Sequence, residues 1–317
     1  MEAPLEVLMK ESFGQLYARL YRENFEELEA LRSKAKRNSV GVIFATATIF
    51  ILASINPIFI LLLIAGLVIW AVRSSRIKGK QSFEVQKRGR TYPEVFKEKI
   101  VGPIIEHTFE TAKYNAKQGL SSFDYNKAGY NDRYDRFFSD DLIIAPLKAD
   151  NDISTFITFA EVHTERESRD DDGHTTYVTV FHGLAGSFLI PKNVGKRIYI
   201  RSNGRVNGWN KNKVKMDMPE FEKVFDVESD DPILAMRILT SDVMAEMIDL
   251  YKKYKYRFEI NIINDTVYMR LRTGVMFEPN VFKSSVEYKQ IEKYYLVLKA
   301  LTNIAEHIYD TILRLEV

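Results

Sequence analysis

Cysteine is absent from this chain of 317 residues. Without thiols the protein has no disulfides, no thiolate metal site and no cysteine nucleophile. A chain without cysteine is compatible with a cytoplasmic location, where disulfides are rare.

A marked excess of charge of one sign is also missing. The chain carries 45 basic and 43 acidic residues and a net charge of +2. Nucleic-acid binding usually requires a concentrated excess of lysine and arginine, so we expect no nucleic-acid partner. Aromatic residues make up 12% of the chain, and this content argues against wholesale disorder.

The common nucleotide-binding and catalytic motifs are missing as well. The sequence has no Walker-type loop, no G-x-S-x-G elbow and no G-x-G-x-x-G fingerprint. We therefore predict no cofactor and no small-molecule substrate, and we expect a binding protein more than an enzyme.

Charge is entirely lacking between residues 40 and 72, in a protein that is 28% charged. The run begins too far along the chain, and behind too many charged residues, for a cleaved signal peptide. Asn56-Pro57 divides it into two halves of about 23 Å each at about 1.5 Å per residue. Both flanks are basic, which favours a transmembrane helical hairpin with both ends in the cytoplasm. The residues that define this anchor are Val40, Phe44, Ile55, Asn56, Pro57, Ile58 and Trp70.

Two alternatives to the hairpin stay open. One is a single kinked span, which would be about 50 Å long and would need a strong tilt. The other is a buried hairpin in the core of a soluble protein. The hairpin itself either crosses the bilayer or enters it without crossing.

Helical periodicity surrounds this segment. Residues 4–37 repeat apolar side chains at three- and four-residue steps, which predicts an amphipathic helix. That helix either lies on a surface or partner, or packs on the protein's own C-terminal domain. Residues 74–92 are polar and basic and are predicted to form a linker. A second amphipathic helix is predicted to begin at Pro93 and to kink at Gly102-Pro103.

After residue 141 the periodicity shifts toward two, the period of β-strands. We expect a helix over 232–254, then a hairpin that turns at Asn264-Asp265. This order predicts an α+β fold, with a mainly antiparallel sheet and helices on one face. The predicted strands are 142–147, 155–162, 175–181, 186–190, 197–201, 213–216, 224–227, 257–263 and 266–272.

The C-terminal segment has heptad spacing over more than three repeats. It predicts a helix that either associates with another chain or with the N-terminal helix, or docks on its own domain. The predicted organisation is thus 1–38 amphipathic helix, 39–73 transmembrane hairpin, 74–92 linker, 93–284 α+β domain and 285–317 heptad helix. The heptad positions are Ile291, Tyr294, Leu298, Leu301, Ile308, Ile312 and Leu315.

Several short stretches resemble the DUF3137 family, bacterial proteins of unknown function. The closest likeness is at 218–225 (MPEFEKVF) and 227–231 (VESDD). Further likeness lies at 138–143 (FSDDLI), 159–162 (FAEV), 182–184 (HGL), 238–240 (ILT) and 277–279 (FEP). The resemblance covers roughly residues 85–285. It implies kinship of fold and an apolar segment ahead of the domain, but no activity and no catalytic residue.

Candidate metal ligands are few. His163 and Glu161 lie on one face of a predicted strand, and His182 lies across the predicted hairpin, so a His/carboxylate site is one hypothesis. The alternative is that these are ordinary polar residues on a solvent face. The Asp170–Asp172 run resembles part of a calcium loop but lacks the spaced ligands, so we interpret it as a turn. Asp140 and Asp141, as adjacent strand residues, are expected to point to opposite faces.

These observations predict a membrane-anchored cytoplasmic interaction or assembly module. Its expected location is the inner membrane, with the N-terminus and the folded domain facing the cytoplasm. Its expected partners are the lipid bilayer and a second copy or another membrane-associated protein. The alternative is a membrane-associated metal-dependent hydrolase that uses the cluster of His163, Glu161 and His182.

Overall fold

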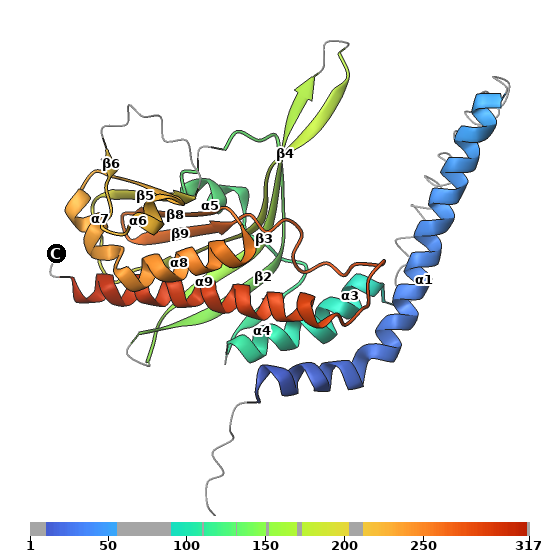
Figure 1. The fold of residues 1–317 in the computed structure, drawn as a ribbon, viewed down its shortest axis with the longest axis horizontal. Helices are drawn as coiled ribbons and strands as arrows, with labels where there is room; N and C mark the ends of the chain where they lie inside the picture. The colour runs from blue at the N-terminus through green and yellow to red at the C-terminus, as the bar shows by residue number, and fades with distance from the viewer. Residues whose placement is uncertain are drawn as a thin grey trace, which may run out of the picture. The chain divides into compact units, whose positions relative to one another are not determined.

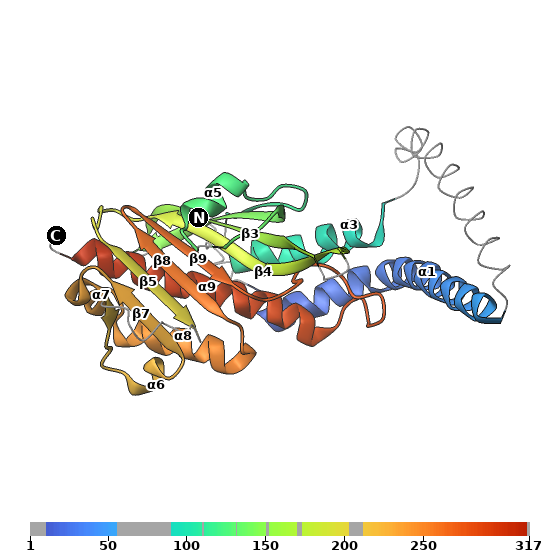
Figure 2. The ribbon, with the colours of Figure 1, turned by 90° about the horizontal axis from the view of Figure 1, so that it is seen from above.

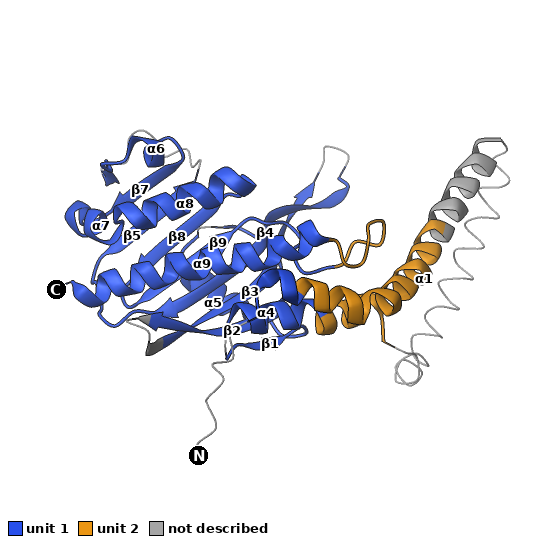
Figure 3. Cartoon of the chain, turned by 60° about the horizontal axis from the view of Figure 1, so that its bottom comes forward, with its two compact units in different colours: residues 1–16, 100–278, 288–317 blue, residues 17–99, 279–287 orange. Residues whose placement is uncertain are grey.

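The computed structural model describes residues 11–55, 90–109, 111–130, 132–149, 152–169, 173–202 and 212–315. The chain divides into two compact units (Figure 3). The first contains Met1–Leu16, Ile100–Glu278 and Tyr288–Val317, and the second contains Tyr17–Lys99 and Pro279–Glu287.

The first helix is longer than the sequence indicated. Helix α1 runs unbroken from Phe13 to Ile55, so the amphipathic segment and the first half of the apolar run form one helix. Its buried side chains recur every four residues, as expected for one face of a helix: Leu16, Leu20, Asn24 and Leu28.

The predicted membrane hairpin is not shown by this structure. Among the described residues we find no helix whose length and apolar character would suffice to cross a membrane. Asn56, Pro57, Ile58 and Trp70, which belong to the predicted hairpin, lie outside the described residues.

In the second unit, α1 packs against a distant part of its own chain. The hydroxyl group of Tyr17 donates to the backbone oxygen of Val286 at 3.1 Å, and Arg32 donates to that of Val281 at 3.0 Å. Glu29 accepts from the hydroxyl of Ser285 at 3.1 Å. These contacts show that part of the amphipathic face is used within the chain.

The second predicted helix is broken near the expected place. Helix α3 (Tyr92–Phe96) begins with a proline in its first turn, and the chain continues as a π-helical turn (Lys97–Val101). Helix α4 (Gly102–Thr108) follows. Pro103 has no backbone N–H to donate into the preceding turn, which accounts for the interruption just before it.

The first unit is built on one antiparallel sheet. Within the described residues the sheet has nine strands in the order β1-β2-β3-β4-β9-β8-β5-β7-β6, and every neighbouring pair is antiparallel. The predicted α+β class with a mainly antiparallel sheet is therefore confirmed. The strands are β1 (Lys113–Asn115), β2 (Arg136–Ala149), β3 (Asp152–Arg169), β4 (Thr175–Leu189), β5 (Arg197–Ser202), β6 (Lys213–Val214), β7 (Phe225–Ser229), β8 (Phe258–Ile263) and β9 (Thr266–Leu271).

Two predicted elements have different extents in the structure. The segments 175–181 and 186–190 are parts of one strand, β4, because β3 pairs with it on both sides of Gly183. The predicted helix 232–254 is two helices, α7 (Pro232–Ile238) and α8 (Ser241–Tyr254). The break falls at Thr240, whose side chain accepts from the backbone N–H of Val243 and so caps α8.

Helices cover both faces of the sheet, where the sequence predicted only one. Helix α9 (Tyr288–Arg314) packs on α8, α4, α7 and strand β2. Figure 2 shows α9 and α8 on one face of the sheet and α5 (Ser122–Lys127) on the other. The remaining short helix, α6 (Pro219–Glu222), contacts α8 and β7.

Candidate functional site

A β-bulge in strand β2 gathers acidic side chains. The register between β2 and β3 shifts between Asp140 and Ile143, and Asp141 has a left-handed backbone with a φ of 55°. Because the bulge interrupts the alternation of side chains, Asp140 and Asp141 do not separate to opposite faces, and that expectation was wrong. Their carboxylates and that of Glu278 have oxygens within 4.8 Å of one another.

The middle of this cluster is buried. Asp141 is fully buried and accepts a hydrogen bond from the hydroxyl group of Tyr114 at 2.5 Å. Burial raises the pKa of Tyr114 well above its usual range, and the neighbouring Asp141 raises it further, so the phenol stays protonated as a donor. Among the described residues, this is the group of three acidic or histidine side chains close enough to share one ion. Carboxylate oxygens suit a hard divalent cation, although such clusters also occur without one.

Of the predicted candidates, His182 contacts both His163 and Glu161. His163 and His182 are direct cross-strand partners on β3 and β4. His182 Nε2 lies 3.1 Å from Glu161 Oε1, and His163 Nε2 lies 3.2 Å from the hydroxyl oxygen of Thr179.

Hydrogen bonds engage both carboxylate oxygens of Glu161, which is buried. Its Oε2 accepts from the backbone N–H groups of Met276 at 3.0 Å and Phe277 at 3.2 Å, while Oε1 faces His182. This arrangement ties β3 to β4 and to the segment after β9. Glu161 therefore acts as a structural brace in this geometry and has little capacity left to bind a metal.

A second cluster, on the opposite face of the sheet, was missed by sequence reasoning. The guanidinium group of Arg270 is almost fully buried and donates to Glu259 at 2.9 Å, to the hydroxyl of Tyr125 at 2.8 Å, and to Asp132. It also lies 4.0 Å from the ring centroid of Tyr130. Nearby acids hold the pKa of Arg270 above its usual range against the cost of burial, so the charge is kept.

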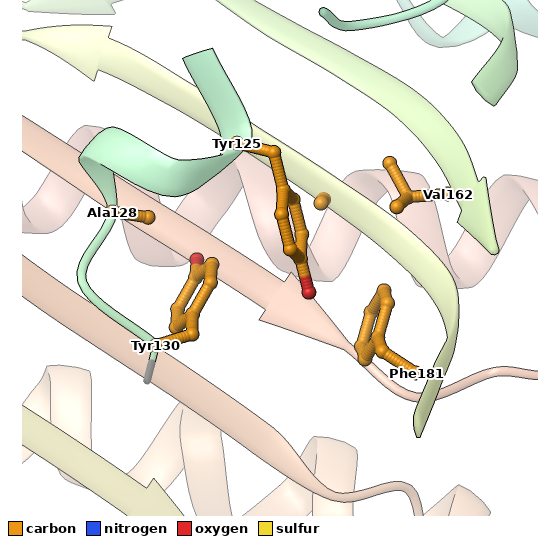
Figure 4. Packing of buried hydrophobic residues seen from close by; sticks show 6 residues of the cluster. Tyr125, Ala128, Tyr130, Val162 and Phe181 are labelled. Carbon is orange, nitrogen blue, oxygen red and sulfur yellow. The ribbon is translucent and has the colours of Figure 1, made fainter. Parts of the chain in front are cut away.

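The aromatic rings around Arg270 come from two separate parts of the chain. Figure 4 shows Tyr125 on α5, Tyr130 in the loop that follows, and Phe181 on β4, all facing one another above the sheet. Tyr125 and Tyr130 have ring centroids 5.5 Å apart. The cluster packs α5 and the loop that follows it against the sheet.

The heptad positions of the C-terminal helix are covered within the chain. All seven predicted residues are buried: Ile291, Tyr294, Leu298, Leu301, Ile308, Ile312 and Leu315. Within this chain the heptad stripe packs on helices and strands of its own unit. Of the membrane-anchor residues, Val40, Phe44 and Ile55 lie in helix α1.

Comparisons with known proteins give one informative match. Residues 179–309 match the model of a family described as "Protein of unknown function (DUF3137)". The predicted resemblance to the DUF3137 family is confirmed. The DUF3137 match begins within β4 and extends into α9, further toward the C-terminus than the range of 85–285 that short stretches indicated.

The remaining comparisons add no functional argument. No curated protein matches the chain significantly. One solved structure, the crystal structure of the mycobacterial trehalose monomycolate transport factor A, TtfA, matches with a TM-score of 0.31 and 5% sequence identity. The match covers 65% of this chain and 95% of that chain, and at this TM-score it supports no inference.

Proposed function

We propose that this protein is a membrane-tethered module, anchored by a helical hairpin at 39–73, whose folded units face the cytoplasm and assemble with a second copy or with another membrane-associated protein. One observation carries the proposal. Helix α1 continues without a break from the buried stripe of Leu20 and Leu28 into the uncharged run that begins at residue 40. A helix shared in this way would couple the anchor directly to folded structure.

The basic residues on both sides of the uncharged run support an orientation in which both ends of the hairpin face the cytoplasm. Lys34, Lys36 and Arg37 precede the run, and Arg73, Arg76, Lys78 and Lys80 follow it. Since basic residues collect on the cytoplasmic side of bacterial membranes, basic residues at both ends favour a hairpin over a single span.

The absence of cysteine makes the test direct, because any introduced cysteine is the only thiol in the chain. Ser33→Cys and Ser82→Cys place a thiol on either side of the run. We expect the full-length protein in the inner membrane of the expression host, with both thiols protected from an impermeant maleimide in spheroplasts and labelled after lysis. Labelling of one position in intact spheroplasts would show a single span instead. Recovery of the protein in the soluble fraction would overturn the tether.

The second candidate, a metal-dependent hydrolase, is favoured by one observation: His182 contacts both Glu161 and His163, two of the residues that this hypothesis names. The engaged oxygens of Glu161 weigh against it. Calorimetric titration with Zn²⁺ and Mn²⁺ tests whether these residues bind a metal. We expect the same heat of metal addition for the wild type and for His182→Gln. Metal binding by the wild type that is abolished in His182→Gln would favour the hydrolase.

A further inference from the structure

If copies of this chain associate, the heptad stripe of α9 is not the surface they use. Its apolar positions are buried against α8, α4, α7 and β2 within one chain. Exposing the stripe to a partner would require undocking α9. A self-association surface other than this stripe is therefore required.

The sheet carries a two-stranded arm that extends beyond its neighbours. Strand β4 pairs with β9 only over Leu184–Leu189, whereas its pairing with β3 continues out to Thr175. Figure 1 shows this part of β3 and β4 projecting past the other strands. Residues 164–169 and 175–180 make up the described part of this arm.

The two edges of the arm differ. On the β3 side, the backbone N–H of Asp135 donates to the oxygen of Glu165 at 2.8 Å, and the carboxylate of Asp135 accepts from the N–H of Glu167 at 2.7 Å. On the β4 side, no described residue pairs with the backbone from Thr175 to Val180. Among the described residues, the arm thus has one edge that is hydrogen-bonded to Asp135 and one edge without a pairing strand, which we call the open edge.

The open edge has the composition of a pairing strand. Residues 175–180 (TTYVTV) are β-branched or aromatic, with no charge, proline or glycine. Tyr177 is 37% exposed and Val178 is 49% exposed. The four charged side chains of the arm lie on β3: Glu165, Arg166, Glu167 and Arg169. Exposed edge strands are normally protected by lysine, proline or a bulge. This edge has no lysine or proline between residues 175 and 180, and the register with β3 shifts once, at Val180, which leaves Thr175–Thr179 in regular pairing.

We propose that the open edge of β4, residues 175–180, pairs in antiparallel fashion with the same edge of a second copy of this chain, joining two sheets across a two-fold axis. The proposal deepens the proposed function, on whose self-assembly it rests, by naming the surface and the partner.

A second copy fits this edge because the edge is complementary to itself. Antiparallel pairing about a two-fold axis perpendicular to the sheet places a residue opposite its own counterpart, with Thr, Val and Tyr facing one another on each face. Such cross-strand pairs are favourable, and no like charges become direct neighbours. The charged β3 strands of the two copies would be separated by about 14 Å, three strand spacings, where solvent screens their interaction.

The first test is disulfide trapping in the full-length protein, in membranes and then in detergent. Single cysteines are placed in turn at residues 175–180, and Ser168→Cys on the neighbouring strand is the matched control. The structure gives Ser168 and Thr176 as direct cross-strand partners, so the control shares the exposure and differs in its distance from the edge. We expect a crosslinked dimer that peaks at one position of the edge and is weak or absent for the control.

The second test blocks the edge without disturbing the fold. Val178→Lys adds a charge at an exposed position, and Ser168→Lys makes the same change one strand away. By light scattering corrected for bound detergent, we expect a dimer for the wild type and for Ser168→Lys, and at least a tenfold weaker dimer for Val178→Lys. All three should remain in the membrane fraction.

The outcomes separate this inference from the membrane tether. A dimer that Val178→Lys leaves intact, or equal crosslinking of Ser168→Cys, would overturn the edge pairing. A monomeric wild type in the membrane fraction would overturn self-association through any surface and leave the tether standing. Loss of the wild type from the membrane fraction would overturn the tether alone, since edge pairing is measured independently by crosslinking.

Discussion

The imidazole rings of His163 and His182 lie face to face across the β3–β4 ladder, with centroids 4.3 Å apart and planes 14° from parallel. Burial lowers the pKa of both rings. For His163 the neighbouring His182 lowers the pKa further, while Glu165 opposes the shift. For His182 the carboxylate of Asp140 opposes it. The stacked pair therefore favours neutral rings in the folded state.

This pair predicts a loss of stability in mild acid. Because the folded-state pKa lies below the unfolded value of about 6.5, the unfolded state binds more protons just below that pH. The contribution of the two histidines to the free energy of unfolding is complete above about pH 7. It decreases as the pH falls through about 6.5 toward the folded-state pKa. Urea unfolding at pH 7.5 and at pH 5.5 measures how much the free energy of unfolding decreases in acid. We expect this decrease to be smaller in His163→Gln than in the wild type. An unchanged difference in that variant would contradict the assignment, and His174→Gln, at an exposed position, is the control.

Arg270 should be among the residues most sensitive to substitution. Arg270→Met removes the positive charge between Asp132 and Glu259 and leaves two partly buried carboxylates without it. Breaking a buried ion pair in this way costs about 3–5 kcal/mol. Denaturant titration checks this value. The control is Lys127→Met, which breaks an exposed pair with Asp124 and should cost less than about 1 kcal/mol. An equal loss of unfolding free energy in Arg270→Met and Lys127→Met would show that the buried ion pairs of Arg270 stabilise the fold no more than an exposed pair does.

The left-handed backbone of Asp141 distinguishes two substitutions at that position. Asn adopts this conformation readily, keeps an acceptor for Tyr114 and removes one charge from the carboxylate cluster. With EDTA present we expect Asp141→Asn to unfold at the same temperature as the wild type or higher. Asp141→Val is strained by about 1–2 kcal/mol and loses the acceptor as well, so it should unfold at a lower temperature. The idea fails if the two variants melt together.

Two glycines give opposite predictions for the same change to alanine. A Cβ on Gly186 would lie 2.2 Å from the backbone oxygen of Thr158 and 2.4 Å from the ring of Phe159, so Gly186→Ala should destabilise the fold by about 1–3 kcal/mol. A Cβ on Gly14, in helix α1, meets nothing within 4 Å. Gly14→Ala should therefore stabilise the helix by about 0.5–1 kcal/mol. Thermal unfolding of both variants checks the sign of each effect, and a stabilised Gly186→Ala would contradict the packing described for β3 and β4.

Local sequence patterns were sufficient to predict helices and strands whose conformation depends mainly on residues close in the sequence. The β8–β9 hairpin was predicted almost to the residue, because alternation flanks an Asn-Asp turn and Asn264 adopts the left-handed conformation that such turns need. The heptad spacing likewise predicted α9, but it did not distinguish docking from association. That choice depends on α4, α8 and β2, which lie far away in the sequence.

Features that depend on contacts between residues far apart in the sequence were not predicted. The bulge at Asp141 exists only in relation to the register of β3, so the two aspartates looked like ordinary alternating residues. Arg270 was not singled out from the sequence, because its partners Asp132 and Tyr125 come from a distant part of the chain. The membrane hairpin stays a prediction, because its turn and second half fall outside the described residues.

The position of β4 between β3 and β9 has a consequence for synthesis on the ribosome. Strands β2, β3 and β4 are neighbours in sequence and can pair as soon as they emerge, but β9 follows only after β5 to β8 have been made. At elongation rates of about 5–20 residues per second, the part of β4 that pairs with β9, which includes the buried Phe188, waits several seconds for its partner. During that interval the nascent chain presents an apolar strand edge, so its yield should depend on how quickly translation reaches β9.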